Sequence, residues 1–246
     1  MTCRSGFIVG LVVCVTLSAT ADEPADIDLG APSGKKADKG SLATAEEYRS
    51  RALELIKKGD FRKATADLTA AIRLEPKNAV LYAERGQLFA SAGDQKRALA
   101  DFDLAVRFDP KLAMPYAARA DLWRRKGEYA RAKADYSEAL RVEPKNAVVS
   151  CNLAWLLSTC PLNNLRDGRR ALQLATQACE QMEWTEPESL DTLAAANAEV
   201  GDFEQAQIWQ GKAMRIAEER QHELKGAKER LALYKQEKPY REPWKN

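Results

Sequence analysis

Three cysteines lie within one short stretch of the sequence and are the first candidates for chemistry. They are Cys151, Cys160 and Cys179, and a PLNN segment and an Arg-Asp pair stand between the last two. A thiol can act as a nucleophile, as a metal ligand or as half of a disulfide. The residues around these cysteines and along the rest of the chain distinguish these roles.

Catalysis and metal binding both lack the partner residues that they need. The chain has one histidine, His222, and we expect it to be exposed. The segment QACEQ at 177–181 is similar to the caspase cysteine signature, but the closing glycine is absent and no histidine lies upstream. No CxxC, HExxH, GxGxxG or P-loop pattern occurs, and we expect the many carboxylates to lie on solvated helix faces or at helix caps. The sequence therefore predicts no enzyme activity, no metal and no cofactor.

A disulfide is the remaining chemical role for the cysteines. Cys151 and Cys179 stand 14 residues before and after Leu165, so an antiparallel helix pair would place them at similar heights. Cys160 would lie at the other end of that pair. If one bridge forms, we expect it between Cys151 and Cys179; the alternative is three free thiols that fill small spaces in the core.

Composition favours a soluble helical protein. The chain has 246 residues, of which 45% are apolar and 30% charged, with 13 glycines and 10 prolines. The net charge of +2 is too small to attract nucleic acid strongly, and we expect no nucleic-acid partner. The abundance of Ala, Leu, Arg, Lys and Glu suits helices.

The first residues are typical of an export signal. Arg4 precedes an apolar run at 7–17, and Ala-Thr-Ala ends at residue 21. The run is about half as long as a membrane-spanning helix. We expect a signal peptide at 1–21 followed by a disordered linker at 22–44, and hence a periplasmic or secreted protein. The alternative is a chain anchored in the membrane by an uncleaved N-terminal segment.

Several markers repeat every 34 residues, and this periodicity is the strongest signal in the chain. The repeating positions are Tyr48, Tyr82 and Tyr116; Gly59, Gly93 and Gly127; Ala64, Ala98 and Ala132; and Pro76, Pro110 and Pro144. Each unit fits two helices: Gly93 ends the first helix of the second unit, Asp94 caps the next helix and Pro110 stops it. Small residues at Gly86 and Ala98 would let the two helices approach closely.

This pattern resembles the tetratricopeptide repeat (TPR). The resemblance implies an all-α, right-handed solenoid of five helix-turn-helix pairs with a C-terminal capping helix. We expect the repeats at 45–78, 79–112, 113–146, 147–184 and 187–218, the capping helix at 219–235 and a tail at 236–246. In the fourth repeat we expect Pro161 to end the first helix, a turn lengthened by five residues, and Asp167 as the cap of the second helix. Thr185 and Glu188 suggest a capping box at the start of the first helix of the fifth repeat.

The second half shows a closer resemblance. NLAWLLSTCP, RDGRRALQLA, LDTLAAA, GDFEQA and LYKQEKPYRE are similar to the C-terminal module of a group of exported or periplasmic bacterial repeat proteins. That resemblance covers about 150–242 and implies a scaffold without known catalytic activity.

Binding is the function that stacked helix pairs suggest, because their first helices line a concave face. Small side chains there would leave room for an extended peptide, with Trp155 as an apolar contact and the charged residues as polar contacts. The predicted partner-binding residues are Arg49, Ala83, Gln87, Ala117, Asp121, Arg124, Arg125 and Trp155. The alternative is a solvated inner face without a ligand.

A particular ligand, the chaperone C-terminus, is disfavoured. TPR proteins that bind it use a Lys/Arg and Asn clamp, and Arg49 matches one clamp position. The other positions hold Leu53, Glu84, Met114 and Ala118. We therefore expect a non-enzymatic scaffold or adaptor that binds a protein or peptide, with no small-molecule substrate. The alternative is an accessory or recognition subunit of a cell-envelope enzyme or polysaccharide machine.

Overall fold

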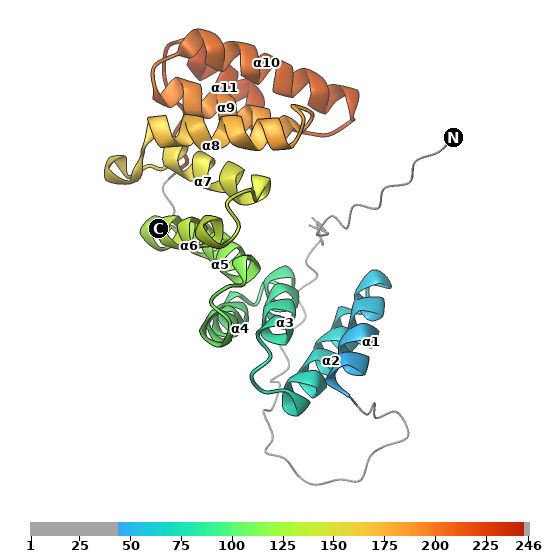
Figure 1. Cartoon of the computed structure of the whole chain (residues 1–246). Helices are drawn as coiled ribbons and strands as arrows, with labels where there is room; N and C mark the ends of the chain where they lie inside the picture. The colour runs from blue at the N-terminus through green and yellow to red at the C-terminus, as the bar shows by residue number, and fades with distance from the viewer. Residues whose placement is uncertain (1–43, 244–246) are drawn as a thin grey trace. The chain divides into compact units, whose positions relative to one another are not determined.

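The computed structural model describes residues 44–243 (Figure 1). These residues contain eleven α-helices and no strand. The predicted signal peptide and nearly all of the predicted linker lie outside these residues. The helices are α1 (Ala45–Lys57), α2 (Phe61–Leu74), α3 (Ala79–Ser91), α4 (Gln95–Phe108), α5 (Ala113–Arg125), α6 (Tyr129–Val142), α7 (Ala147–Thr159), α8 (Gly168–Gln181), α9 (Pro187–Glu199), α10 (Phe203–Glu219) and α11 (Ala227–Tyr234).

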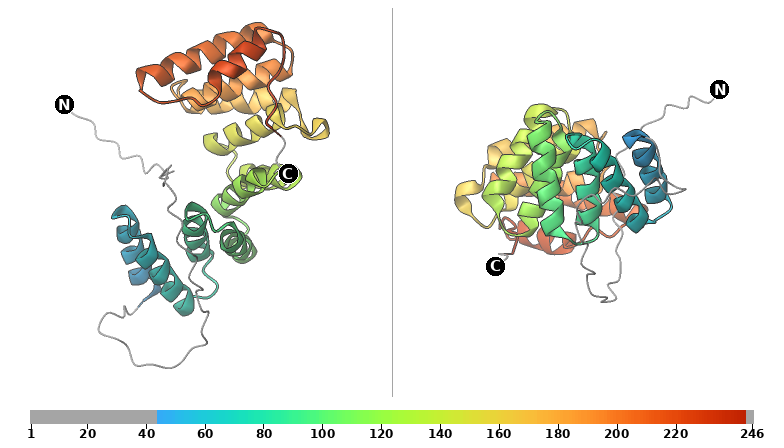
Figure 2. Two further views of the ribbon diagram at one scale, coloured as in Figure 1. Left: turned by 180° about the vertical axis from the view of Figure 1, so that it is seen from behind. Right: turned by 90° about the horizontal axis from the view of Figure 1, so that it is seen from below.

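The helices form five consecutive pairs and a final single helix. We name α1, α3, α5, α7 and α9 the A helices and α2, α4, α6, α8 and α10 the B helices. Each A helix packs on the B helix that follows it, and each B helix packs on the next A helix (Figures 1 and 2). The last helix, α11, packs on α10 and α9. The predicted all-α solenoid of five helix pairs with a capping helix is confirmed.

The turns within the pairs follow the predicted glycine-aspartate pattern. Gly93 has a φ of +82°, a left-handed conformation that glycine adopts without steric cost. The Asp94 side chain then accepts a hydrogen bond from the Arg97 amide and caps α4.

Small residues allow close packing within a pair, as predicted. Gly86 of α3 is buried against Phe102 of α4, and a Cβ atom at this position would lie 2.8 Å from the phenyl ring. Ala98 and Phe102 are themselves fully buried. A side chain at Gly86 would therefore push the two helices apart.

The fourth pair has the predicted longer turn. Helix α7 ends at Thr159, before Pro161, and a short 3₁₀ turn at Asn163–Leu165 follows. Asp167 caps α8 by accepting from the Arg170 amide. The Asp167 amide in turn donates to the Leu157 carbonyl at 3.0 Å, which ties the turn to α7.

Two expectations for the last third of the chain were wrong. Glu186, not Thr185, is the N-cap of α9, and Thr185 donates to the Met182 carbonyl, so no Thr185–Glu188 capping box forms. The last helix is also shorter than predicted, because α10 continues to Glu219 and a connection at 220–226 precedes α11.

Candidate interaction surface

A repeated set of three side chains fixes each of the first three A helices to its B helix. We name these sets the Tyr–Arg–Asp triads; they are Tyr48–Arg51–Asp67, Tyr82–Arg85–Asp101 and Tyr116–Arg119–Asp135. Arg85, for example, donates to both carboxylate oxygens of Asp101 at 2.8 Å and lies 5.7 Å from the centre of the Tyr82 ring. The three aspartates are buried, which corrects the expectation that the carboxylates lie on solvated faces or at caps.

The first predicted binding residue, Arg49, is engaged inside the chain. Its guanidinium donates to the Glu84 carboxylate at 2.6–2.9 Å and so joins α1 to α3. The hydrogen bond with Glu84 raises the pKa of Arg49, although partial burial acts in the opposite direction. Glu84 thus accepts the hydrogen bonds of Arg49. It occupies a position where the chaperone clamp would need another residue type.

Asp121 is also held by neighbouring side chains. It accepts a short hydrogen bond from the Tyr136 hydroxyl and a longer one, 3.4 Å, from the Asn152 amide. Burial raises the pKa of Asp121, while Tyr136, Arg124 and Arg125 oppose that rise. Because Asp121 links α5 to α6 and α7, it positions these helices and is not an open polar contact.

The chain's own C-terminal segment contacts two further predicted residues, Arg124 of α5 and Trp155 of α7. The Glu242 carboxylate accepts from Arg124 at 2.6 Å and from the indole nitrogen of Trp155 at 2.8 Å. The Tyr240 ring lies 6.0 Å from the Trp155 ring, centre to centre. We name residues 240–242 the tail segment. The predicted apolar contact residue is therefore covered by residues that sequence analysis placed in a separate tail.

The end of helix α7 holds the same segment through main-chain carbonyls. The last turn of a helix leaves carbonyls without intrahelical partners. The Thr159 carbonyl accepts from the Glu242 amide at 2.8 Å, and the Ser158 carbonyl accepts from Arg241 at 3.0 Å. Arg241 also forms an ion pair with Glu199 of α9 at 2.6 Å. The tail segment thus satisfies carbonyls that α7 cannot pair within itself.

A buried ion pair supports the aromatic side of this contact. Asp191 of α9 accepts from Arg230 of α11 at 2.7–2.8 Å and from Gln210 of α10 at 2.7 Å. Burial raises the pKa of Asp191, and Arg230 opposes the rise. The Arg230 guanidinium lies 5.2 Å from the Trp155 ring and 5.6 Å from the Tyr240 ring. We name the residues around the tail segment the tail site; they are Arg124, Trp155, Glu199 and Arg230 with the carbonyls of Ser158 and Thr159.

The predicted binding residues therefore differ in their surroundings. Ala83 is only 1% exposed and belongs to the core. Gln87 and Arg125 are exposed and Ala117 is half-buried. Sequence analysis missed Tyr240, Glu242 and Arg230, because no periodicity links the tail to α7. The signal that could have linked them is the resemblance noted above, which implies that NLAWLLSTCP and LYKQEKPYRE belong to one C-terminal module.

The three cysteines are buried free thiols in this structure. The Cys151 thiol donates to the Thr192 hydroxyl at 3.2 Å. Burial raises the pKa of Cys151 to about 12; Thr192 acts against the rise and the nearby Cys179 adds to it. Since the thiolate is the reactive form, this environment makes Cys151 a poor nucleophile. A Cys151–Cys179 bridge stays a prediction.

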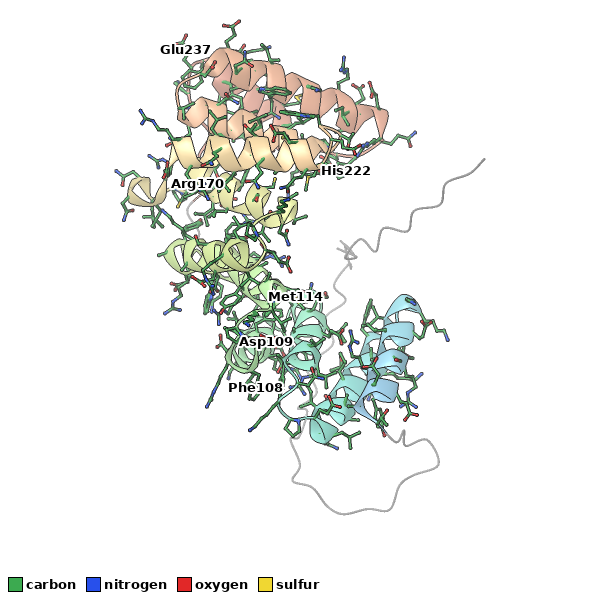
Figure 3. The ribbon with its side chains drawn as sticks, viewed as in Figure 1. Phe108, Asp109, Met114, Arg170, His222 and Glu237 are labelled. Carbon is green, nitrogen blue, oxygen red and sulfur yellow. The ribbon has the colours of Figure 1, made fainter. Side chains whose placement is uncertain are left out.

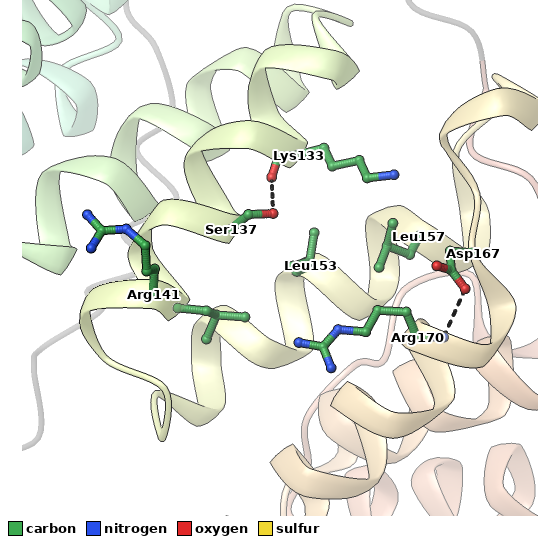
Figure 4. Close-up of a pocket in the computed structure, with 8 residues that line it drawn as sticks. Lys133, Ser137, Arg141, Leu153, Leu157, Asp167 and Arg170 are labelled. Atoms are coloured by element: carbon green, nitrogen blue, oxygen red, sulfur yellow. Dashed lines mark hydrogen bonds between the residues drawn. The ribbon is translucent and has the colours of Figure 1, made fainter.

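A pocket of about 290 Å³ lies away from the predicted residues, between α6, α7 and the start of α8. Leu153 and Leu157 of α7 lie between the basic side chains of α6 and α8 (Figure 4). Lys133 donates to the Leu165 carbonyl, Arg141 pairs with Glu138, and Arg170 donates to Gln173. These internal contacts engage the basic groups around the pocket.

His222 and Met114 are two exposed side chains in the part of the chain that the structure describes. His222 lies in the connection between α10 and α11 and contacts Glu188 at 2.6 Å (Figure 3). Met114 lies at the start of α5, near Phe108 and Asp109, and is 43% exposed. Among residues 44–243, no three His, Cys, Asp or Glu side chains are placed to hold a metal ion. None of the helices described has the length and apolar content needed to cross a membrane.

Comparison with known proteins agrees with this architecture. A family model described as tetratricopeptide repeat matches residues 38–78 and 115–146. No curated protein matches the chain. The chain thus contains tetratricopeptide repeats, and its described residues fold as a TPR solenoid.

Several solved TPR structures share the fold at low sequence identity. MamA from Desulfovibrio magneticus RS-1 is 18% identical, with a TM-score of 0.59 over 71% of this chain and 96% of that chain. A TPR protein from Parabacteroides merdae ATCC 43184 is 20% identical, with a TM-score of 0.61 over 78% of this chain and 74% of that one. YrrB, described as a TPR protein with an unusual peptide-binding site, is 17% identical, with a TM-score of 0.58 over 70% of this chain and 86% of its own. At these identities the likeness is one of fold.

Proposed function

We propose that this protein is a non-catalytic scaffold or adaptor that binds an extended segment of a partner protein on the face formed by α1, α3, α5 and α7. We name this surface the A-helix face. One observation carries the proposal: the chain's own residues 240–242 already lie against α5 and α7 of this face. They are held there by a main-chain hydrogen bond, by ion pairs and by an aromatic contact.

The A-helix face continues beyond the tail site toward α3 and α1. Gln87 of α3 and Arg125 of α5 are exposed. Ala117 of α5 is half-buried. Small and polar side chains of this kind leave the backbone of a bound segment close to the helices and offer hydrogen bonds to it. The description of YrrB as a TPR protein with a peptide-binding site supports the proposal at the level of fold.

A pull-down with matched charge variants tests this proposal. The variant Gln87→Glu/Arg125→Glu changes the charge of the open A-helix face by −3. The control variant Gln95→Glu/Lys96→Glu makes the same change at exposed positions of the B helix α4. We expect the first variant to lose partners that the wild-type chain and the control retain, as identified by mass spectrometry. Equal recovery of the same partners by both variants would contradict the proposal.

We infer the cellular site of this function from the N-terminal sequence. The basic start, the short apolar run and the Ala-Thr-Ala ending at residue 21 support export, with residues 22–44 as a tether between the leader and α1. We therefore place the proposed scaffold in an envelope assembly. Recovery of an envelope enzyme or a polysaccharide-processing complex in the pull-down would support the alternative, in which the protein is an accessory subunit of that complex.

A further inference from the structure

We propose that the tail site is an exchangeable peptide-binding site for a partner segment with the order aromatic–basic–acidic, and that the tail segment is its competitor within the chain. This inference rests on the proposed function, because it assigns a ligand class to the α5 and α7 part of the A-helix face and to the residues of α9 and α11 beside it. It goes beyond that function by naming the sequence that is recognised and the element that blocks access.

The contacts alternate along the tail segment, as in recognition of an extended peptide. Tyr240 and Glu242 both contact Trp155, whereas Arg241 between them contacts Glu199 and the Ser158 carbonyl. Side chains of an extended chain point alternately to opposite sides, so residues one and three share a surface. The Glu242 amide adds a main-chain hydrogen bond to the Thr159 carbonyl. One main-chain hydrogen bond and alternating side-chain contacts are the two kinds of contact by which proteins bind extended peptides, although no sheet edge takes part here.

The tail site is held in place by residues outside the tail segment. Arg230 is fixed by Asp191 and by the Lys225 carbonyl. Glu199 is paired with Arg166 at 3.0 Å. Each of these charged side chains therefore keeps a partner when the tail segment leaves. A site that is already ordered binds a ligand with a smaller entropic cost, which favours exchange over collapse.

The charges of the tail site define which segment fits. Arg124 is partly buried, so a ligand without an acidic third residue would leave its charge without the carboxylate. Glu199 selects a basic second residue in the same way. A ligand without an aromatic first residue would lose the contacts with Trp155 and Arg230. The three positions together distinguish the segment from an arbitrary charged peptide.

The tail segment competes because it is attached nearby. Residues 235–239 connect it to α11, and 235–238 are exposed. The connection is short and its amides donate to carbonyls at the end of α11, so the tail segment stays close to the site at an effective concentration on the order of 1 mM. If the tail segment itself binds the site with an intrinsic Kd of about 10 µM, it lowers the apparent affinity for a partner segment about a hundredfold. A strong or abundant partner is then needed to displace the tail.

The first experiment measures binding of a fluorescein-labelled hexapeptide, KPYREP, by fluorescence polarisation. The full chain with Tyr240→Ala and Glu242→Ala has a weakened tail segment, and we expect it to bind the peptide saturably. The wild-type chain should bind at least about tenfold more weakly because its tail occupies the site. Peptides with Ala in place of Tyr or of Glu, and a variant chain that also carries Trp155→Ala, are the controls and should not bind. A folded Tyr240→Ala/Glu242→Ala chain that does not bind KPYREP overturns the inference.

A second experiment applies if the double variant does not fold. A protease site inserted in the exposed connection at 235–238 lets the chain fold with its tail in place before the tail is cut. We expect labelled KPYREP to replace the cut tail, as measured by native mass spectrometry, while the helical circular dichroism signal is kept. A cut tail that never exchanges, or a chain that unfolds when the tail leaves, overturns the inference and makes the tail an integral part of the fold.

The remaining outcomes separate this inference from its alternatives. A wild-type chain that dimerises by placing its tail in the tail site of a second copy would overturn the assignment to a partner protein. If peptide exchange fails while the Gln87→Glu/Arg125→Glu variant still loses its partners, the proposed function stands and only the tail site is excluded.

Discussion

At the scale of single residues, the buried aspartates of the three Tyr–Arg–Asp triads are the most consequential charges. Asp101 is 4% exposed and has both carboxylate oxygens paired with Arg85. A buried ion pair adds little compared with a well-packed apolar pair, but removal of one partner leaves an unpaired buried charge. The triads therefore hold α1, α3 and α5 each in one position relative to the B helix that follows.

Replacement of Arg85 by methionine tests this argument. We expect Arg85→Met to lower the free energy of unfolding by about 3–5 kcal/mol, because the Asp101 carboxylate stays buried without its cation. The double variant Arg85→Met/Asp101→Leu should recover more than half of that loss, since two apolar side chains replace the pair. Urea denaturation followed by circular dichroism measures both effects.

The matched control is Arg107→Met at an exposed position of α4. A surface substitution of this kind should change the free energy of unfolding by less than about 0.5 kcal/mol. A loss below about 1 kcal/mol for Arg85→Met would show that Asp101 finds water or another partner when the arginine is absent.

The triads could have been predicted, and the tail site could not. Arg51, Arg85 and Arg119 repeat every 34 residues, as do their aspartates, so the periodicity that reveals the repeats also contains the triads. We expected their aspartates on solvated helix faces or at caps, because charge alone predicts exposure. Glu242 has no equivalent elsewhere in the chain, and its contact with Arg124 spans 118 positions. Local patterns carry no information about such a contact.

At the scale of helices, the close approach of α3 to α4 depends on one glycine. Glycine inside a helix is normally unfavourable by about 1 kcal/mol relative to alanine. At Gly86 this cost is offset, because any Cβ atom would lie 2.8–2.9 Å from the fully buried Phe102 ring. At Gly211 of α10 a Cβ atom would have no neighbour within 4 Å. The same residue type thus has opposite roles in two helices.

Substitution of alanine at each glycine should therefore change stability in opposite directions. We expect Gly86→Ala to destabilise the chain by about 1–3 kcal/mol through overpacking, and Gly211→Ala to stabilise it by up to about 1 kcal/mol through helix propensity. Thermal and urea denaturation of both variants give the comparison. A stabilised Gly86→Ala chain would mean that α3 and α4 separate without cost, contrary to the packing described.

The boundaries of the helices show where sequence patterns succeed. Pro161 and Asp167 correctly predicted the end of α7 and the start of α8, because proline and N-cap aspartate act locally. The start of α9 was predicted wrongly, because Thr185 donates to the Met182 carbonyl and is not free to cap the helix. Which of two nearby polar residues becomes the cap depends on the loop conformation, and the sequence pattern does not contain it.

At the scale of the whole array, burial is distributed unevenly from one end to the other. Eleven of the thirteen residues of α9 are buried, and this helix packs on α7, α8, α10 and α11. Two of the thirteen residues of α1 are buried, and its main contact is with α2. In repeat arrays each unit depends chiefly on its neighbours, so helices at an end can open without the rest. The tail segment adds further contacts at α7 and α9.

Hydrogen exchange should therefore follow a gradient along the array. We expect the amides of α9 to exchange at least about tenfold more slowly than those of α1, since each factor of ten corresponds to about 1.4 kcal/mol of opening free energy. Exchange monitored by mass spectrometry on peptides from each helix measures this difference. The variant Glu242→Ala should speed exchange at the C-terminal end of α7 and leave α2 unchanged, because only the former contacts the tail segment. Equal protection of α1 and α9 would instead indicate that the array opens as one cooperative unit, in which the terminal pair gains as much from its neighbours as the centre does.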